Sequence, residues 1–193
     1  MTVDRRRYLG LVAGAAAALA GCSSNGGSGT TTTDGTTANG TTTAGTTTGP
    51  ATEATVGMYT EESGQQTAFY FDPVGLHVAP GATVTFEVKS GGHSSTSYSP
   101  GNPMAETTRI PDGAKPWDSA VLNETGATFE HVFETEGTYD YYCIPHKSLG
   151  MVARIVVGSP GGPAEGSMPP DGDVPTSDAI LSHGSISHDA FRG

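Results

Sequence analysis

One short stretch of the chain holds three side chains that bind soft metal ions. Its sequence is Cys-Ile-Pro-His-Lys-Ser-Leu-Gly-Met, running from Cys143 through His146 to Met151. Thiolate and imidazole together suit copper, and a thioether at longer range suits the weak axial position of a copper site. That geometry needs a second imidazole, which does not have to be close in sequence. His93, which follows two glycines, can supply it.

The elements that must position these ligands are short β-strands. Between residues 54 and 158, β-prone runs are separated by Gly and Pro turn signals, and several runs alternate apolar and polar residues. In one of them Val84, Phe86 and Val88 share a face. No segment shows a helical period over three turns. The pattern predicts strands at 69–71, 76–78, 83–88, 128–133, 139–143 and 152–157.

Many short strands over roughly 100 residues are typical of an antiparallel β-sandwich. The Cys-His-Met stretch then forms a tight loop between two of the strands, and His93 follows another strand that can end at the same pole of the sandwich. An irregular stretch, 91–122, interrupts the strands, and we expect a short helix near 111–114.

The N-terminus has the features of an export signal. Arg5-Arg6-Arg7-Tyr-Leu precedes an apolar run that ends in Leu-Ala-Gly before Cys22. The run is about half the ~20 residues that a membrane-spanning helix needs. The paired arginines resemble a twin-arginine signal, and Leu-Ala-Gly-Cys resembles a lipobox. We therefore expect a lipoprotein signal at 1–21 and lipidation of Cys22, with an uncleaved N-terminal anchor as the alternative.

The remaining segments flank the predicted domain. Residues 22–53 are rich in Thr and Gly and have no apolar period, so they predict a disordered tether. Residues 159–193 are Pro-, Gly- and Asp-rich and are interpreted as a C-terminal tail. If Cys22 is lipidated, Cys143 has no disulfide partner, and an unpaired thiol on an exported protein favours a metal-bound role.

The charge of the chain is strongly negative. The full sequence has a formal charge of −11, and removal of residues 1–21 takes away three arginines and Asp4, which leaves 19 acidic and 6 basic residues and a charge of −13. This charge argues against a nucleic-acid partner. An acidic surface poor in lysine is also typical of proteins from saline environments, although an ordinary acidic protein has the same composition.

The spacing Cys-x2-His-x4-Met with an upstream His resembles the ligand pattern of the cupredoxins, and plastocyanin, pseudoazurin and the halocyanins share it. The resemblance extends over roughly 54–158, with matching segments at 71–86, 109–114, 137–143 and 150–152. The lipobox, the Thr-rich tether and the acidic surface resemble the halocyanins, the cupredoxins of halophilic archaea. Two positions differ from the pattern: Ser94 stands where plastocyanin and pseudoazurin have Asn, and Ala153 replaces a common Gly.

The resemblance implies an all-β, eight-stranded Greek-key sandwich with one type 1 (blue) copper per chain. It implies His93 and His146 bound through Nδ1, Cys143 as the thiolate and Met151 as the weak axial ligand. The chain is then a monomeric electron carrier and not an enzyme. Its partners are expected to be redox proteins of a membrane electron-transport chain, and the lipid is expected to hold it at the outer face of the cytoplasmic membrane.

Other interpretations of the same residues are weaker. Structural zinc favours Cys and His over Met, a Cys–His nucleophile lacks a visible oxyanion framework, and a dinuclear copper centre needs a second Cys in the loop. Two alternatives to electron transfer remain open, which are copper storage or delivery and a surface lipoprotein whose sandwich has lost its metal.

Overall fold

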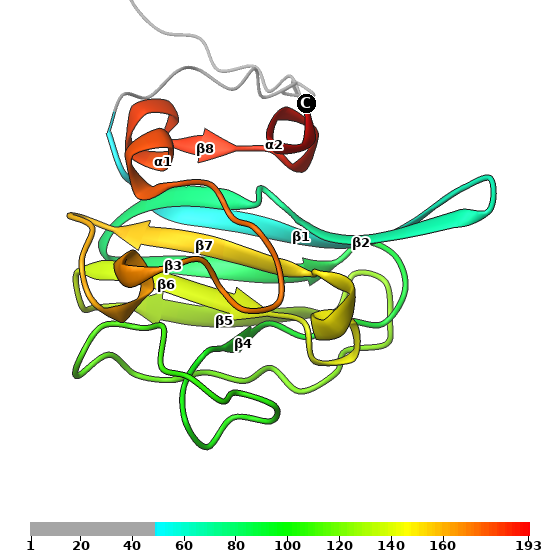
Figure 1. Ribbon diagram of the computed structural model, residues 1–193, viewed down its shortest axis with the longest axis horizontal. Coiled ribbons are helices and arrows are strands. Elements are labelled where there is room, and N and C mark those ends of the chain that lie inside the picture. Colours follow the sequence, from blue (N-terminus) through cyan, green and yellow to red (C-terminus); the bar gives the residue numbers. More distant parts are fainter. Residues whose placement is uncertain (1–48) are drawn as a thin grey trace, which may run out of the picture. The chain divides into compact units, whose positions relative to one another are not determined.

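The computed structural model describes residues 49–193 (Figure 1). The predicted signal at 1–21, lipidation of Cys22 and most of the predicted tether therefore lie outside the described residues. From residue 49 onward, no helix is both long enough and apolar enough to cross a bilayer.

The described chain is built mainly of strands. The strands are β1 (Ala51–Ser63), β2 (Gln66–Asp72), β3 (Gly75–Val88), β4 (Thr96–Ser97), β5 (Thr128–Phe133), β6 (Gly137–Tyr142), β7 (Val152–Val157) and β8 (Ser185–Ile186). The 3-10 helices are η1 (Ile144–Leu149) and η2 (Pro163–Gly166), and the α-helices are α1 (Ser177–His183) and α2 (His188–Arg192). Their order across the sheet is β2-β1-β3-β7-β6-β4, and both β5 and β8 also pair with β3.

Strand β3 joins the two layers of the sandwich. Its first residues, Gly75–Val78, pair with β7. Residues Ala82–Glu87 pair with β5 along one edge, and residues 83–88 pair with residues 53–58 of β1 along the opposite edge. Between the two halves, Gly81 has φ +84, a left-handed conformation that glycine adopts at low cost. The strand therefore bends at Pro80-Gly81 and contributes one half to each layer, which Figure 1 shows as a twisted stack of strands.

The all-β prediction is confirmed, but some elements differ from their predicted form. The predicted strands at 76–78 and 83–88 are parts of the single strand β3, and β1 was not predicted at all. The predicted short helix at 111–114 is wrong: the segment is a turn closed by the Ala114 N–H on the Pro111 carbonyl, 3.1 Å. Gly113 has φ +78, a left-handed conformation outside the α-helical region, so the segment closes as a turn and does not continue as a helix.

The core lies between the two layers. Val84, Phe86 and Val88 are fully buried on one face of β3, as their alternation predicted. Across the core, Phe86 meets Tyr141 edge-on at 5.4 Å between ring centroids, and Trp117 packs against Phe133 at 5.1 Å. Aromatic pairs with these offset geometries contribute about 0.5–1.5 kcal/mol beyond the area they bury.

Residues 159–193 pack on the sandwich. Strand β8 pairs with the start of β3, and Val174 and Ile180 are buried. The side chain of Thr176 caps α1 by accepting from the Ala179 N–H. In Figure 1 the last part of this segment lies along one side of the strands, with α1 and α2 at opposite ends of β8, and the part that precedes α1 crosses in front of the strands. These residues therefore pack against the sandwich as part of the folded domain.

His131 is a buried histidine that is expected to make the fold sensitive to acid. Its imidazole is 8 % exposed and stacks on Trp117, with the ring centroids 4.7 Å apart. Burial, and secondarily the charge of Lys115, lowers the pKa of His131 from 6.5 to about 4. Because the folded state then binds the proton less well than the unfolded state, the contribution of His131 is complete above pH 6.5 and is lost as the pH falls towards 4.

We expect the free energy of unfolding to fall by up to about 3 kcal/mol across this pH window, since one pKa unit corresponds to about 1.4 kcal/mol. The variant His131→Phe keeps a buried ring without a titrating group. Denaturant unfolding at about pH 7 and about pH 4.5 should show a smaller difference for this variant than for the unaltered chain. An equal difference for both proteins would contradict the assignment, and the exposed His183→Phe serves as the matched control.

Candidate metal centre

His93 is held at one end of the sandwich by a pair of backbone hydrogen bonds to one neighbouring residue. It follows β3, and its N–H and carbonyl both bond with Leu122, at 2.9 and 2.7 Å. Gly91 makes the preceding turn at φ +77, and a Cβ there would come within 2.2 Å of the Thr60 hydroxyl. Only glycine therefore lets the chain turn at this point and bring the His93 ring against β1.

The three other predicted ligands lie on a loop between β6 and β7. Cys143 directly follows β6, His146 lies within η1, and Met151 directly precedes β7. Gly150 closes η1 in the left-handed conformation, φ 86, and the chain turns back so that the Met151 N–H bonds to the His146 carbonyl at 3.2 Å. The Cys143 N–H in turn bonds to the Met151 carbonyl at 3.1 Å. The loop's own backbone thus holds the three residues together.

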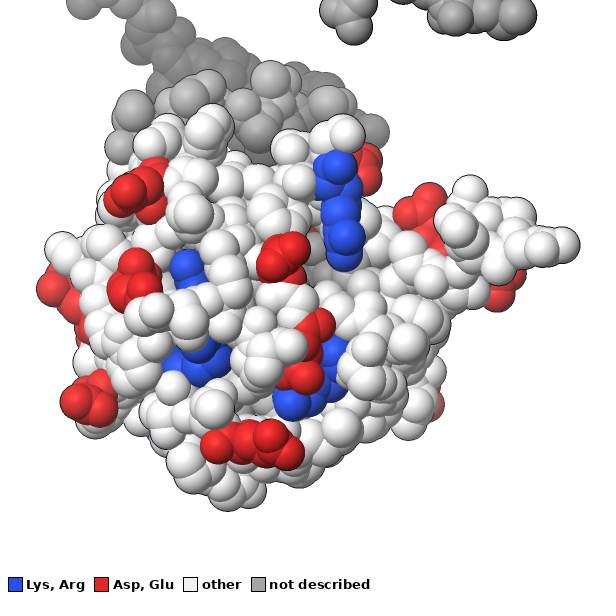
Figure 2. All heavy atoms as spheres, viewed as in Figure 1, with Lys and Arg blue, Asp and Glu red and all other residues white. Residues whose placement is uncertain are grey.

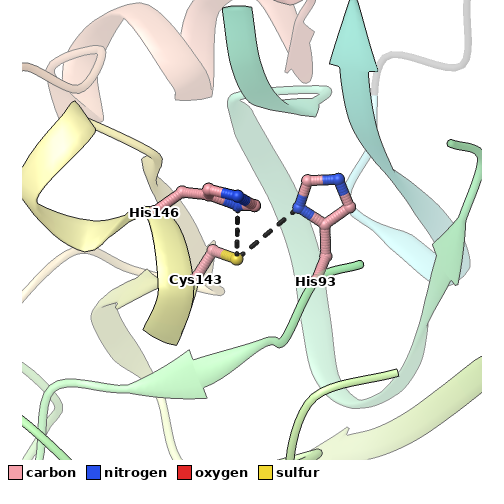
Figure 3. Close-up of side chains that lie close together, drawn as sticks. All are labelled: His93, Cys143 and His146. Carbon is pink, nitrogen blue, oxygen red and sulfur yellow. Dashed lines mark hydrogen bonds between the residues drawn. The ribbon is translucent and has the colours of Figure 1, made fainter. Parts of the chain in front are cut away.

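The thiol and the two imidazoles converge on one point. Cys143 Sγ lies 3.5 Å from His93 Nδ1 and 3.4 Å from His146 Nδ1, and all three atoms lie within 4.8 Å of one another. Figure 3 shows both rings turning their Nδ1 atoms towards the sulfur. Cys143 and His93 are fully buried, whereas His146 is half-buried. Met151 is also fully buried.

The tautomer of His93 follows from its outer contacts. Its Nε2 lies 2.9 Å from the Ser90 carbonyl and 3.0 Å from the Thr60 hydroxyl. A carbonyl oxygen only accepts hydrogen bonds, so Nε2 carries the hydrogen. The lone pair of Nδ1 is then free and faces Cys143, which is the arrangement that a metal-binding histidine needs.

Burial sets the protonation of all three groups. It lowers the pKa of His93 to about 4, assisted by His146 and opposed by the bond to Ser90, and it also lowers the pKa of His146. Both imidazoles are therefore neutral near pH 7. Burial raises the pKa of Cys143, against the effect of the Ser94 N–H. The metal-free thiol thus keeps its proton, and a metal ion would displace it on binding.

The donor set fits a metal ion held by these residues. With metal–sulfur and metal–nitrogen bonds of ~2.3 and ~2.0 Å, ligand atoms around one ion lie roughly 3–4 Å apart, which is the separation found here. One thiolate with two imidazoles in a largely buried group favours copper among the first-row metals.

Two contacts to the His146 loop were not predicted from the sequence. Phe69 on β2 stacks on the His146 ring, with centroids 3.9 Å apart and 12° between the planes. Asp171, in the C-terminal segment, accepts from Lys147 Nζ at 2.9 Å and from the Tyr98 hydroxyl at 2.7 Å. Both partners come from remote parts of the sequence, and only the position of β2 and of residues 159–193 on the sandwich reveals them.

Phe69 is expected to hold the His146 ring in its binding orientation. We predict that Phe69→Ala weakens copper binding by roughly 2- to 10-fold, because a stacked aromatic pair contributes about 0.5–1.5 kcal/mol. Competition with a copper chelator measures the affinity. The matched control is Tyr70→Ala, since the neighbouring ring stacks on Tyr59 and His188 instead. Equal affinities for Phe69→Ala and the unaltered chain would contradict this role.

The other histidines of the described chain lie outside the cluster. His77 Nε2 contacts the Gly158 carbonyl at 2.9 Å, and His131 packs in the aromatic core. His183 is exposed on α1, where its Nδ1 contacts the Ala179 carbonyl, and His188 stacks on Tyr70. Among residues 49–193, the one group of three or more His, Cys, Asp or Glu side chains placed to hold an ion is His93, Cys143 and His146.

A β-sandwich that carries a Cys–His–His cluster at one pole defines a cupredoxin. The family model of copper-binding proteins of the plastocyanin/azurin family matches residues 58–158, and the chain belongs to this family.

The chain is similar to several individual members of the family. It is 33% identical over 111 residues to halocyanin of Natronomonas pharaonis, covering 52% of this chain and 62% of the relative. It is 34% identical over 110 residues to chloroplast plastocyanin of Physcomitrium patens, covering 55% and 59%. The chain thus spans about six tenths of the length of these two relatives. Among solved structures, pseudoazurin from Methylobacterium extorquens AM1 is 27% identical, with a TM-score of 0.47 and coverage of 68% and 96%.

Proposed function

We propose that this chain is a type 1 copper protein that carries single electrons, with one copper bound by His93, Cys143, His146 and Met151. The observation that supports this most directly is the convergence of Cys143 Sγ and two Nδ1 atoms, one of which has its lone pair fixed by Ser90. Met151 is the weak axial ligand in this proposal, and its burial next to the Cys143 backbone supports that role.

A bound copper ion would supply the chemistry by alternating between Cu(I) and Cu(II). The protein's part is to keep the same ligands in both states. The pair of backbone bonds between His93 and Leu122 and the backbone bonds within the 143–151 loop support such rigidity. No substrate is transformed in this proposal, so the chain is not an enzyme.

Electrons are proposed to pass through His146, the half-buried histidine of the cluster. Around it, Pro145 is exposed, Ile144 is partly buried and Leu149 is 62 % exposed. These apolar side chains form a docking patch for a redox partner. Acidic side chains are spread over the face of the molecule in Figure 2, and basic ones occur at fewer places. In concentrated salt such charges are screened within a few Å, so apolar contact would dominate docking.

We further propose that the domain is a monomer tethered to the outer face of the cytoplasmic membrane. In this organisation residues 1–21 are a signal, Cys22 carries lipid, and the tether predicted at 22–53 ends where β1 begins at Ala51. Residues 54–158 contain the copper site, and the predicted tail, 159–193, packs on the sandwich. The direction of β1 supports it: Ala51 pairs with Val78, whereas Thr60 reaches His93. At ~3.3 Å per residue, about 30 Å separate the two ends. Ala51 therefore lies at the end of β1 that is farther from the copper site.

The proposal is tested by loading the purified chain with Cu(II). We expect one copper per chain, an intense visible band from sulfur-to-copper charge transfer, narrow copper hyperfine splitting in electron spin resonance and a reversible one-electron voltammetric wave. A pale Cu(II) complex without such a wave, or copper that exchanges readily with a chaperone, would instead favour storage or delivery.

A further inference from the structure

Four consecutive hydroxyl residues next to His93 are fully buried. Ser94, Ser95, Thr96 and Ser97 each have no exposed surface. Serine and threonine are mostly exposed in proteins, and buried hydroxyls need hydrogen-bond partners. The partners of this segment come largely from the segment 117–119: Trp117 Nε1 donates to Ser95 Oγ at 2.9 Å, and Ser97 Oγ donates to the Trp117 carbonyl at 3.2 Å.

Two of the hydroxyls form a chain of hydrogen bonds with only one possible direction. Thr96 Oγ1 donates to Asp118 Oδ1 at 2.9 Å, because an ionised carboxylate only accepts. The Thr96 oxygen must then accept from the Ser94 hydroxyl, 3.0 Å away. With its own hydrogen turned towards Thr96, Ser94 Oγ offers a lone pair to the Ile144 N–H at 2.8 Å. The order is therefore Ile144 to Ser94 to Thr96 to Asp118.

The chain connects the two segments that carry the copper ligands. Ser94 follows His93, and Ile144 follows Cys143. A second bond joins the same segments, since the Ser94 N–H donates to Cys143 Sγ at 3.4 Å. Ser94 occupies the position where plastocyanin and pseudoazurin have Asn. In this chain the shorter hydroxyl bridges the segments, and Thr96 with Asp118 decides where that hydroxyl points.

We infer that Thr96 and Asp118 are positioning residues for the copper centre, which act by fixing the Ser94 hydroxyl and touch no ligand themselves. This inference rests on the proposed copper site. Asp118 is exposed and also accepts from the Ala120 N–H at 3.0 Å, so the buried relay ends in a carboxylate at the protein surface. Charge-assisted hydrogen bonds are roughly twice as strong as neutral ones, and each bond in a chain polarises the next.

The test compares Thr96→Val and Asp118→Ala with the conservative Thr96→Ser. Amide hydrogen exchange of Ile144 in the metal-free protein reports on the relay without copper. We expect exchange about tenfold faster in Thr96→Val and Asp118→Ala, as loss of one hydrogen bond implies, and unaltered exchange in Thr96→Ser. In the copper-loaded protein the reduction potential should fall and the hyperfine splitting should change in the first two variants only, because a weaker Ser94–Cys143 bond stabilises the reduced thiolate site less.

Ser119→Ala is the matched control. It removes a bond between the same two segments, Ser95 N–H to Ser119 Oγ at 2.9 Å, without altering the relay. The inference would be overturned if Ser119→Ala changed the Ile144 exchange and the reduction potential as much as Thr96→Val and Asp118→Ala do. It would also be overturned if those two variants exchanged faster throughout the domain, or if Asp118→Ala left both the exchange and the potential unaltered. Both proposals would be overturned if no blue site formed and the Ile144 amide exchanged at the same rate in all variants as in the unaltered chain. If no blue site formed but Ile144 showed the predicted exchange pattern, only the copper function would be refuted.

Discussion

Replacement of Asp140 by asparagine is expected to lower the free energy of unfolding by about 3–5 kcal/mol, since removing one partner of a buried ion pair leaves the other charge uncompensated. Asp140 has no exposed surface. Its carboxylate accepts from Arg109 Nε at 2.8 Å and from Arg154 Nε at 2.8 Å, and both arginines are themselves 4 % exposed. One carboxylate therefore bridges two buried guanidinium groups, and Glu165 adds a further negative charge near Arg154.

The same arginines fasten the C-terminal segment to the sandwich. Arg109 and Arg154 each donate to the Ala164 carbonyl at 3.0 Å, and Arg109 also donates to the Ser167 carbonyl. Because Asp140 fixes both guanidinium groups, Asp140→Asn should also loosen the docking of residues 163–167. Faster amide exchange in that segment than in the central strands would reveal this local effect.

Denaturant unfolding of the copper-loaded protein measures the loss for Asp140→Asn. The matched control is Asp112→Asn, because Asp112 is an exposed carboxylate whose replacement is expected to change stability by less than about 0.5 kcal/mol. Salt screens buried pairs much less than exposed ones, so the loss should persist at about 1 M salt. A loss below about 1 kcal/mol would show that the arginines are adequately solvated without the carboxylate.

The local parts of the metal site could be predicted from the sequence. Cys143, His146 and Met151 lie within one short loop, so their spacing alone brings them together. The alternation of Val84, Phe86 and Val88 showed which face of the strand is buried. His93 followed from the need for a second imidazole at a strand end. These predictions depended on short-range geometry that the sequence expresses directly.

The parts that could not be predicted depend on long-range pairing. Strand β1 has a mostly polar, Thr- and Glu-rich sequence, and its N-terminal residues continue the composition of the preceding linker. Its apolar alternation is short, Ala54, Val56 and Met58, and it was not recognised as a strand signal. The stacking of Phe69 on His146 and the grouping of Arg109 with Asp140 require the sheet order to be known. The segment 111–114 was wrongly predicted to be helical because a Pro-Asp-Gly turn contains residues that also begin helices.

The other large effect is expected at the sulfur of the copper centre, where Cys143→Ser should abolish the intense visible band and the narrow hyperfine splitting. The band arises from charge transfer out of a thiolate, and a serine hydroxyl neither deprotonates readily nor donates comparably soft electron density. Cys143 Sγ is also the atom that the Nδ1 atoms of His93 and His146 both face, so no other side chain among the described residues can replace it. The variant should keep its fold, because the exchange of sulfur for oxygen changes little volume.

Absorption, electron spin resonance and copper stoichiometry measure this effect, with far-ultraviolet circular dichroism to confirm folding. His93→Ala should likewise lose the blue spectrum, because it removes a buried ligand whose lone pair faces the sulfur. His183→Ala is the matched control, since this exposed histidine bonds only within α1. A folded Cys143→Ser that retains the blue band, or a His183→Ala that loses it, would place the copper elsewhere and exclude the 143–151 loop as its binding site.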